Sequence, residues 1–532
     1  MSEEFQEPPS MPWDRGPSIL EFIRSHIVAG RLGLTEEADT LPDEERVSEG
    51  SDIRWSPGAL DGVLMHHVGP GDSEEPIRRI AELTVAYSGQ PTAVNKAAVY
   101  DHIIDEGVVS IIDPVLEVLV KEQGINQQRL YELAHSFVTE APDREPVKFG
   151  IAVLGLFGRA EDQELFQTLG RHEEFTLFAS IAIANGAADA EASLWELAKN
   201  VSGWGRIHLV ERLAETTDPK IKDWLLREGF RNTVEFGYLA ATCARAGNLL
   251  TAITEDSVDR ELLTAAGDIL ESLITGGPAE DIDDYEDARP VIDSFLLHME
   301  TSAETIDDFL YVHAIREYLG QDDSHWSGRF AAGWTPEARE ALSGRCDVIL
   351  ERPGWAEKVQ EQLRSEIPWE FFQADQAAQV IGVDSWEQHW RRLQEKPTDP
   401  GRWFYAAKRS DENRIGRVVA YAEATLDLAS IATGPGDELG LGPGFRQHSC
   451  LDFVLQELRR FPGQAAALIE TGLQSPVVRN RNMAILALAE WPRERWPEHL
   501  ERSLAEAIQR EPKESLRELM QNTLEKGDGG NF

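Results

Sequence analysis

The stretch GWGRIHLVERLAETTDPKIKDWLLREG, residues 203–229, decides the fold. Its first half carries apolar side chains at helical spacing: Trp204, Ile207, Leu209, Val210 and Leu213. A short polar turn follows, in which Asp218 before Pro219 is typical of a helix N-cap with proline in the first turn. A second stripe contains Ile221, Trp224, Leu225 and Phe230. Two short amphipathic helices cannot bury their faces alone, so the stretch predicts one unit of a repeat stack.

The same helical spacing continues along the chain on both sides of this stretch. From residue 76 onward, successive segments carry apolar residues at i, i+3 and i+4, and most end at glycine or in a polar turn. Helix starts lie roughly 15–20 residues apart, which gives a two-helix unit in the size range of helical solenoid repeats. Near the C-terminus, SPVVRNRNMAILALAEWP at 475–492 resembles the second half of a HEAT repeat, with Arg479 placed to reach the adjacent repeat. The sequence therefore predicts an all-α fold, an α-solenoid of HEAT/armadillo-like helical pairs.

Changes in composition suggest how the chain divides. A chain of 532 residues exceeds the roughly 250–300 residues of a single core. Residues 1–75 are expected to form an acidic N-terminal arm with a short helix within 18–33 and a mobile connection at 34–75, which could cover the neighbouring solenoid. A helical-repeat domain is expected at 76–325. A C-terminal, aromatic-rich helical domain with a HEAT-like end is expected at 326–532, because tryptophans become frequent from residue 326.

Net charge and cysteine content limit which partners and which cellular compartment are expected. The formal net charge is −43, and such a surface repels phosphate backbones and anionic membranes, so neither nucleic acid nor membrane is expected as a partner. The three cysteines are scattered and form no CxxC pair, which favours a reducing cytosol and a cytoplasmic location. No signal-peptide pattern and no run of about 18 apolar residues is found in the sequence. The oligomeric state stays open.

A polar cluster around the opening stretch is the candidate binding site. Its members are Trp204, Arg206, His208, Arg231 and Asn232. The functional interpretation is a partner-binding groove on the stack, and the alternative is ordinary capping and packing within a repeat. No second catalytic group is fixed near these residues by spacing, so no catalytic residue is assigned here.

Two acidic segments raise the possibility of a metal site. RHEEFTLF at 171–178 contains His172, Glu173 and Glu174, but a zinc protease motif needs a second histidine at position 176, which is threonine. We expect a helix N-terminus there instead, where acidic residues favour the helix dipole. DIDDYEDARP at 281–290 could supply oxygen ligands to a hard cation but lacks the order of an EF-hand loop, so a solvated loop is expected. No metal ligand is assigned.

A glycine-rich segment and a cysteine–histidine pair complete the candidates. GPGDELGLGPGF at 434–445 lacks the Gly-Lys-Ser/Thr ending of a phosphate loop, which favours a structural or peptide-gripping loop. His448 and Cys450 are two positions apart, so they face different sides of a helix but the same side of a strand, where they could form a nucleophilic pair. No haem attachment motif or dinucleotide fingerprint is present in the sequence, and no cofactor is expected.

Two long strings carry a resemblance to a known family. They are PVKFGIAVLGLFG…DQELFQTLGRHEEFTLFASIAIAN and GWGRIHLVERL…IKDWLLREGFRNTVEFGYLAATCARAGNL. They resemble a family of bacterial proteins often labelled "limonene hydroxylase", over roughly residues 80–320. The family label implies an oxidoreductase that hydroxylates a terpene. Its strings are specific but contain no catalytic motif to carry over.

The residues themselves favour a different function. A stack of helical pairs offers an extended curved surface, and acidic residues on it steer association with a partner. We therefore expect a non-catalytic scaffold that binds a protein or peptide through a curved acidic surface. The alternative is the oxidoreductase that the resemblance implies.

Overall fold

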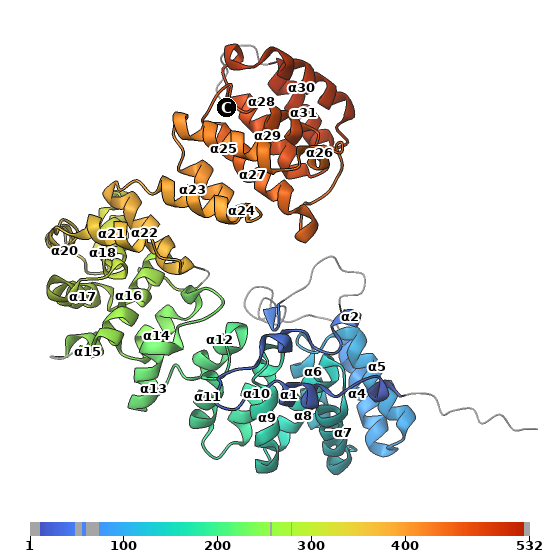
Figure 1. Cartoon of the computed structure of the whole chain (residues 1–532). Helices are drawn as coiled ribbons and strands as arrows, with labels where there is room; N and C mark the ends of the chain where they lie inside the picture. The colour runs from blue at the N-terminus through green and yellow to red at the C-terminus, as the bar shows by residue number, and fades with distance from the viewer. Residues whose placement is uncertain (1–10, 48–55, 60–73, 256–257, 278, 526–532) are drawn as a thin grey trace, which may run out of the picture. The chain divides into compact units, whose positions relative to one another are not determined.

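The chain is helical throughout the part that the structure describes. The computed structural model describes residues 11–47, 56–59, 74–255, 258–277 and 279–525. In these ranges there are α-helices, short 3₁₀ turns and a π-helical turn, and no β-strand (Figure 1). Among the described residues, backbone bridges of β type occur only in isolation, between Ile27 and Leu34 and between Glu438 and Val477. The predicted all-α fold is confirmed.

The chain forms two compact units, Met1–Arg352 and Pro353–Phe532, here called unit 1 and unit 2. The sequence placed a boundary near residue 325, which lies inside the helix Asp323–Ala331. The division falls later because Trp326 and Trp334 belong to the core of unit 1. Their rings lie 5.3 Å apart, edge to face, and both contact the ring of Tyr318. The first tryptophans of the aromatic-rich segment thus complete unit 1.

Unit 1 is a succession of short helices. They are α1 (Ile19–Ser25), α2 (Glu44–Val47), α4 (Glu74–Gly89), α5 (Ala93–Glu106), α6 (Ile112–Lys121), α7 (Gln127–Glu140), α8 (Arg144–Phe157), α9 (Gln163–Leu169), α10 (Glu173–Gly186), α11 (Ala190–Ala198), α12 (Gly203–Arg212), α13 (Pro219–Trp224), α14 (Ala240–Ala246), α15 (Leu249–Thr254), α16 (Arg260–Thr275), α17 (Ala288–Ser302), α18 (Ile306–Gly320), α19 (Asp323–Ala331) and α20 (Pro336–Leu350). A π-helical turn, Leu225–Gly229, extends α13.

Consecutive and alternate helices of unit 1 pack side by side, as a repeat stack requires. Helix α7 packs on α8, α8 on α10 and α10 on α12, and further along α16 packs on α18 and α18 on α20. The backbones of α7 and α8 approach so closely that a Cβ at Gly150 would lie 2.8 Å from the carbonyl oxygen of Ala134. The stretch that opened the sequence analysis forms α12 and α13, and Asp218 caps α13 by accepting the N–H of Lys220 at 2.7 Å. Helices stacked in neighbouring pairs are thus confirmed.

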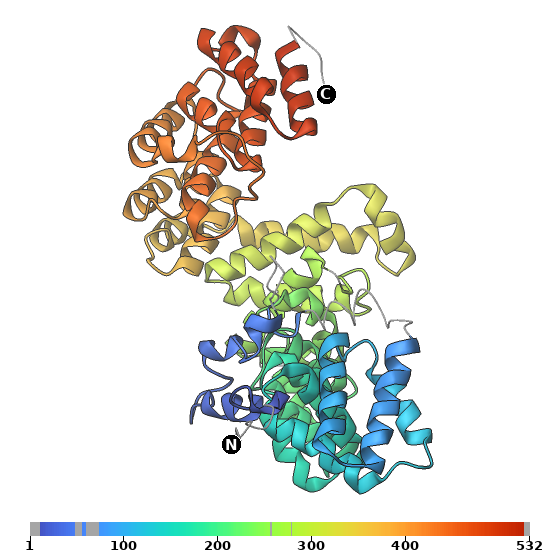
Figure 2. The same cartoon turned by 90° about the vertical axis from the view of Figure 1, so that its right-hand side faces the viewer.

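Residues 11–47, here called the N-terminal strap, lie against this stack (Figure 1). Helix α1 packs on α7 and α9, and Ile19 and Ile23 are fully buried there. Leu41, farther along, is also buried in the core of unit 1. Figure 2 shows the dark blue strap along one side of the stack. The expected mobile connection at 34–75 is therefore docked at 34–47, while residues 48–55 and 60–73 lie outside the described residues.

Unit 2 repeats the pattern, with one long connection at 432–445 between α26 and α27. Its helices are α21 (Trp355–Gln362), α22 (Pro368–Ile381), α23 (Trp386–Glu395), α24 (Pro400–Lys408), α25 (Glu412–Thr425), α26 (Leu428–Ile431), α27 (Arg446–Leu458), α28 (Ala466–Leu473), α29 (Val478–Glu490), α30 (Glu498–Arg510) and α31 (Glu514–Glu525). Helices α24, α27 and α29 pack in a row, and Trp386 and Trp403 are fully buried in the core.

The HEAT-like segment of unit 2 makes the contact predicted for it. Arg479 at the start of α29 lies on α27, with its Nε 2.5 Å from Asp452 Oδ2. A second arginine of the same segment, Arg481, is fully buried and pairs with Glu511, which precedes α31, at 2.7 Å. The sequence analysis did not anticipate this second pair.

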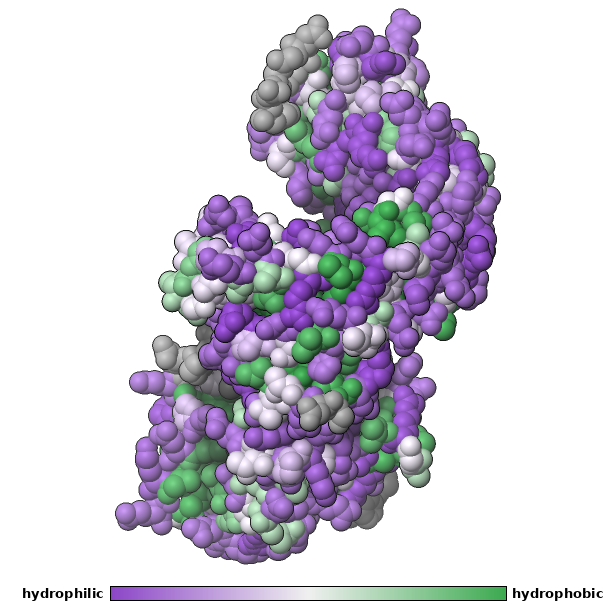
Figure 3. Space-filling model, turned by 90° about the vertical axis from the view of Figure 1, so that its left-hand side faces the viewer, coloured by the Kyte–Doolittle hydropathy of each residue, from purple (hydrophilic) through white to green (hydrophobic). Residues whose placement is uncertain are grey.

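The surface agrees with the composition of the chain. On the face shown in Figure 3, hydrophilic residues predominate and hydrophobic ones gather in separate patches. None of the helices in the described ranges is both long and apolar enough to span a bilayer.

Candidate functional site

Apolar side chains first fix the strap to the stack. Ile19 and Ile23 stand on one face of α1, and both are fully buried. The backbone N–H of Ile19 donates to the carbonyl of Ala141, at the end of α7, over 2.9 Å. Trp13 packs edge to face on Tyr100 of α5 at 6.1 Å. These contacts hold the strap, which includes the short helices α1 and α2, across helices that lie much later in the sequence.

Buried ion pairs then join the strap to the start of α8. Arg144 donates to both carboxylate oxygens of Asp43, at 3.0 and 3.1 Å, and to Glu44 at 2.7 Å. In a second ion pair the charges are reversed: the cation, Arg46, belongs to the strap and lies 2.9 Å from Asp143. The side chain of Asp43 is only 1% exposed. Removing one member of such a pair leaves a buried charge, so these contacts are selective for the segment that docks.

The floor beneath the strap holds a second charged pair. The Lys148 side chain is 2% exposed, and its Nζ lies 2.7 Å from Glu174 Oε1 and 3.1 Å from Glu145 Oε1. Glu174 also accepts the backbone N–H of Gly58 at 3.0 Å. Burial alone would raise the pKa of Glu174, but the charges of Lys148 and Arg144 outweigh it and hold the pKa at about 2. Glu174 therefore stays ionised as a fixed anion under the strap.

Beside the strap lies an open cleft of about 320 Å³. The strap forms one wall, through residues such as Leu34 and Asp39, and the starts of α10 and α12 form the other, through Glu173 and Arg206. Both the strap and these helices belong to unit 1, so the cleft is a feature of that unit alone. It is the place where a polar group of a partner could lie against both the strap and the stack.

Glu173 is the titratable group of this cleft. Its Oε2 accepts the backbone N–H of Trp204 at 2.9 Å, at the N-terminus of α12. This approach requires glycine at Gly203, where φ is +61° and a Cβ would lie 1.8 Å from Glu173 Oε2. Burial raises the pKa of Glu173 to about 7, and the nearby carboxylate of Asp39 adds to this. The group can therefore accept or share a proton near neutral pH.

Arg206 lies in the same cleft and is held by backbone carbonyls. It donates to Val201 at 2.8 Å and to Arg231 at 2.6 Å, and it forms no ion pair within the described residues. Burial lowers the pKa of its guanidinium. Within the described residues, an arginine that has no carboxylate partner and a glutamate that has no cation partner thus line one cleft, an arrangement that can bind a polar or zwitterionic group.

The structure brings the predicted cluster together, but not as one exposed surface. Asn232 donates to the carbonyl of Gly203 at 3.0 Å, and Arg231 pairs with Asp268 at 2.8 Å. Trp204 and His208 are buried within α12, at 8% and 4% exposure. Of the five residues, Arg206 alone lines the cleft of 320 Å³. Whether the cluster binds a partner stays a prediction.

Sequence reasoning missed Asp43 and Arg144, which join the strap to the stack, and Lys148, which shares Glu174 with Arg144. One signal was present, since Lys148 interrupts the apolar run PVKFGIAVLGLF at 146–157. A lone charge in such a run indicates a buried pair. The partner of the pair could not be named from local sequence.

The expected helix N-terminus at His172 is confirmed. His172 precedes α10, and its Nδ1 accepts the N–H of Glu174 at 3.3 Å. Its other ring nitrogen lies 3.0 Å from the carbonyl of Ala38 in the strap. Burial lowers the pKa of His172, which favours the neutral ring. The histidine that resembled part of a metal motif is a further contact between strap and stack.

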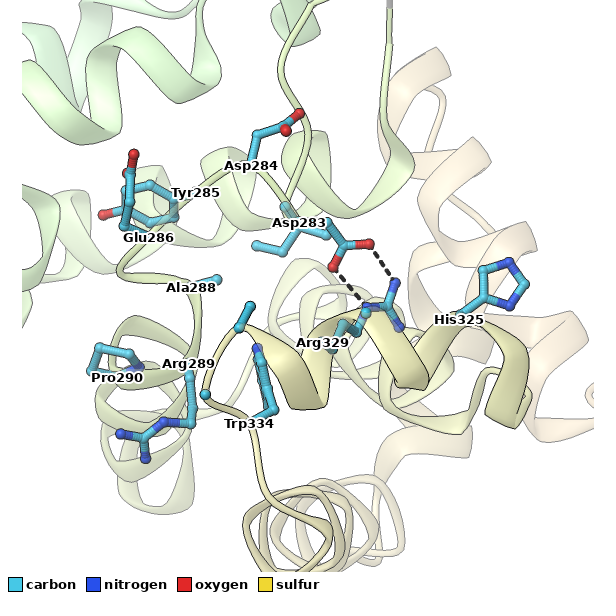
Figure 4. Close-up of a pocket in the computed structure, with 14 residues that line it drawn as sticks. Asp283, Asp284, Tyr285, Glu286, Ala288, Arg289, Pro290, His325, Arg329 and Trp334 are labelled. Atoms are coloured by element: carbon cyan, nitrogen blue, oxygen red, sulfur yellow. Dashed lines mark hydrogen bonds and ion pairs between the residues drawn. The ribbon is translucent and has the colours of Figure 1, made fainter.

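The acidic loop at 281–290 is clamped by arginines. Asp283 accepts two hydrogen bonds from Arg329, at 2.7 and 2.8 Å, and Glu286 pairs with Arg245 at 2.9 Å. The loop borders a cavity of about 680 Å³ (Figure 4). Figure 4 shows the carboxylates of Asp283, Asp284 and Glu286 pointing in different directions. Across the described ranges, no three His, Cys, Asp or Glu side chains gather to hold a metal ion.

The glycine-rich segment of unit 2, residues 434–445, forms hydrogen bonds with the chain around the start of α29. Gly434 N–H donates to the carbonyl of Gln474, and Arg481 donates to the carbonyl of Gly436 at 2.7 Å. Glu438 forms a parallel bridge with Val477 just before α29. These contacts give the loop a structural role in unit 2, and the peptide-gripping alternative stays a prediction.

The cysteine and histidine that follow this loop do not form a pair. Both lie in α27, where positions two apart face different sides. Cys450 is buried, and burial raises the pKa of its thiol to about 12. Burial also lowers the pKa of His448. This thiol is therefore not an activated nucleophile.

Ser385, His389 and Asp375 also meet inside unit 2, but not in the order of a catalytic triad. Ser385 Oγ donates to Asp375 Oδ1 at 2.5 Å, while His389 Nε2 lies 2.9 Å from the same oxygen without hydrogen-bond alignment. In a triad the histidine stands between serine and carboxylate, so that it can take the serine proton. Here Ser385 and His389 both contact the carboxylate of Asp375. The cluster therefore joins α22 to α23.

Comparison with known proteins gives no name to this site: no family model matches the chain, and no curated protein matches it. The resemblance to bacterial proteins labelled "limonene hydroxylase" therefore stays a prediction.

Proposed function

We propose that this protein is a non-catalytic helical-repeat scaffold that binds a protein or peptide partner through the helical surface of unit 1. One observation carries the proposal. The stack already holds a separate segment of polypeptide, the strap with its short helices α1 and α2, by apolar side chains and buried ion pairs such as Asp43 with Arg144. A surface that binds such a segment of its own chain has the chemistry to bind one from another protein.

Charge indicates the kind of partner. Most of the net charge of −43 lies in unit 1, since basic residues nearly balance acidic ones in unit 2. An acidic surface attracts a basic segment over a Debye length of about 10 Å at 0.1 M salt. The partner is therefore expected to be a protein with a basic segment rather than a nucleic acid. All three cysteines are buried thiols, which fits a cytoplasmic location.

The experiment is capture from a native lysate by the tagged full-length chain, with mass spectrometry of what is retained. At about 50 mM salt we expect a partner in stoichiometric amount, and at about 500 mM salt we expect most of it to be lost, because screening weakens steering by exposed charges. Capture that is indifferent to salt would contradict recognition through the acidic surface. Absence of any stoichiometric partner would contradict the scaffold.

The alternative, a terpene hydroxylase, is supported by the family resemblance alone. Oxygen insertion requires haem, flavin or a non-haem metal. Visible absorbance of the purified chain, or iron in stoichiometric amount by elemental analysis, would favour this alternative over the scaffold.

A further inference from the structure

An open groove lies between α4 and α6, at the beginning of the repeat stack. Its volume is about 830 Å³. Apolar side chains form its floor, and they are Ile77, Ala81, Val85, Ala86, Pro114 and Val118. Val118 is 41% exposed, so the floor is open to solvent. The outer face of a terminal repeat is ordinarily polar, because no further repeat covers it. An apolar floor at this place indicates a binding surface.

Glutamates surround this floor. Five of them line the groove: Glu74, Glu75, Glu82, Glu117 and Glu122. Glu82 pairs with Arg78, and Glu117 pairs with Lys121 at 3.0 Å. Glu74, Glu75 and Glu122 make no ion pair within the described residues. The rim therefore carries negative charge that a basic partner could neutralise.

We propose that this groove binds an amphipathic helix with an apolar stripe and basic flanks, contributed by a protein partner. The inference rests on the proposed scaffold function and specifies the partner's chemistry. A helix places apolar residues at i, i+3, i+4 and i+7 on one side, which matches the apolar floor that α4 and α6 form together. Lysines or arginines beside that stripe then meet the glutamate rim.

The first test uses a labelled synthetic peptide and the full-length chain. The peptide has about 18 residues, roughly five helical turns, with leucines on one face and lysines on both flanks. A control peptide has the same composition, with leucines at every second position. Fluorescence anisotropy at low salt should show binding at least about tenfold tighter for the amphipathic peptide. Equal affinity for the two peptides would overturn the proposal.

A pair of matched variants locates the binding. Val118 and Val120 are both exposed on α6, at 41% and 68%, but only Val118 lines the groove. Val118→Lys places a charge in the floor and should weaken binding by about tenfold or more. Val120→Lys should change affinity by less than about twofold, because an exposed substitution outside the site is nearly neutral. Equal effects of the two substitutions would overturn the proposal.

Rim charges are tested separately. The double substitution Glu75→Lys and Glu122→Lys should weaken binding several-fold at low salt and flatten its dependence on ionic strength. Unchanged salt dependence would contradict the role given to the rim.

A last experiment separates the possible occupants. The sequence GVLMHHVG at 62–69 is itself apolar and precedes α4. If the peptide binds only after Val63→Asp and Leu64→Asp, the groove belongs to the chain's own segment and the proposal of a partner helix is overturned. If Val118→Lys still captures the lysate partner fully, the groove inference fails while the scaffold stands. If the peptide binds as expected but the lysate yields no partner, the scaffold fails instead.

Discussion

The two units bury charge in different ways. In unit 1, Arg144 binds Asp43 from 101 residues earlier in the chain, and the pair fixes the strap to the stack. In unit 2, Arg481 binds Glu511, 30 residues away, and both side chains are fully buried between neighbouring helices. Unit 2 is therefore completed by contacts between adjacent repeats. Unit 1 is completed by a segment from much earlier in the chain, the strap, which docks on its helical surface.

The strongest test of this contrast is Arg481→Met in unit 2. Glu511 would then be a buried charge without its partner, which costs about 3–5 kcal/mol of unfolding free energy. Calorimetric unfolding should show a lower transition for unit 2 and an unchanged one for unit 1. The double variant Arg481→Met with Glu511→Leu should recover most of the loss. A loss equal in both variants would mean that packing, not the unpaired charge, explains the effect.

In unit 1 the comparable change is Lys148→Met. It removes the cation 2.7 Å from Glu174, and we expect a loss of about 2–4 kcal/mol, less than in unit 2 because Arg144 still lies near Glu174. Hydrogen exchange should quicken in the strap more than in α16–α20. Lys121→Met is the control, because its pair with Glu117 is exposed at the surface. If the strap exchanged at the same rate in both variants, the pair of Lys148 with Glu174 would not contribute to docking of the strap.

Two adjacent glutamates of unit 1, Glu173 and Glu174, should make its stability depend on pH in opposite directions. The folded pKa of Glu173, about 7, lies above the ordinary 4.5, so its stabilising contribution is complete below pH 4.5 and lost as pH rises through 7. Glu173→Gln cannot ionise, and it should be more stable than the native chain by about 1–2 kcal/mol at pH 8 and equal to it at pH 4. Urea unfolding at both values measures this. A variant less stable at pH 8 would contradict the assignment.

Glu174 should behave in the opposite sense. Its folded pKa of about 2 lies below the ordinary value, so its contribution is present above pH 4.5 and lost as pH falls through 2. We expect the strap to exchange faster in acid in the native chain, and this acid dependence to be smaller in Lys148→Met. Identical acid dependence in both proteins would rule out this ion pair as its source.

The smallest effect is expected at an exposed network. Arg227 pairs with Asp223 and Asp259, whose side chains are about 60% exposed. Arg227→Ala should cost no more than about 1 kcal/mol, and the cost should shrink at high salt. Denaturant unfolding at two salt concentrations measures this. A cost as large as that of Lys148→Met would remove the distinction between buried and exposed pairs.

Sequence predicted the parts of this fold that depend on local pattern. Helical periodicity, the Asp218-Pro219 cap and the helix start at His172 are local signals, and the structure has all three. Docking of the strap could not be predicted, because Asp43 and Arg144 have no shared periodicity and are 101 residues apart. The division at Arg352 and Pro353, rather than near 325, could not be predicted either. A tryptophan such as Trp326 gives the same local signal whether it begins a unit or completes one.

The candidate site was predicted in part for the same reason. Arg206 stood out as a polar residue on an apolar helix, and it does line the cleft. Glu173 depends on the close approach allowed at Gly203, a tertiary contact across α10 and α12. The groove at α4 and α6 depends on which helix faces stay uncovered, which periodicity alone does not show.

The central claim is that unit 1, not unit 2, recognises the partner. Hydrogen exchange of the full-length chain, alone and with the captured partner at low salt, tests it most directly. Slower exchange should be confined to helices and strap of unit 1, with the clearest change at α4 and α6. Slower exchange confined to α22–α31 would contradict the claim.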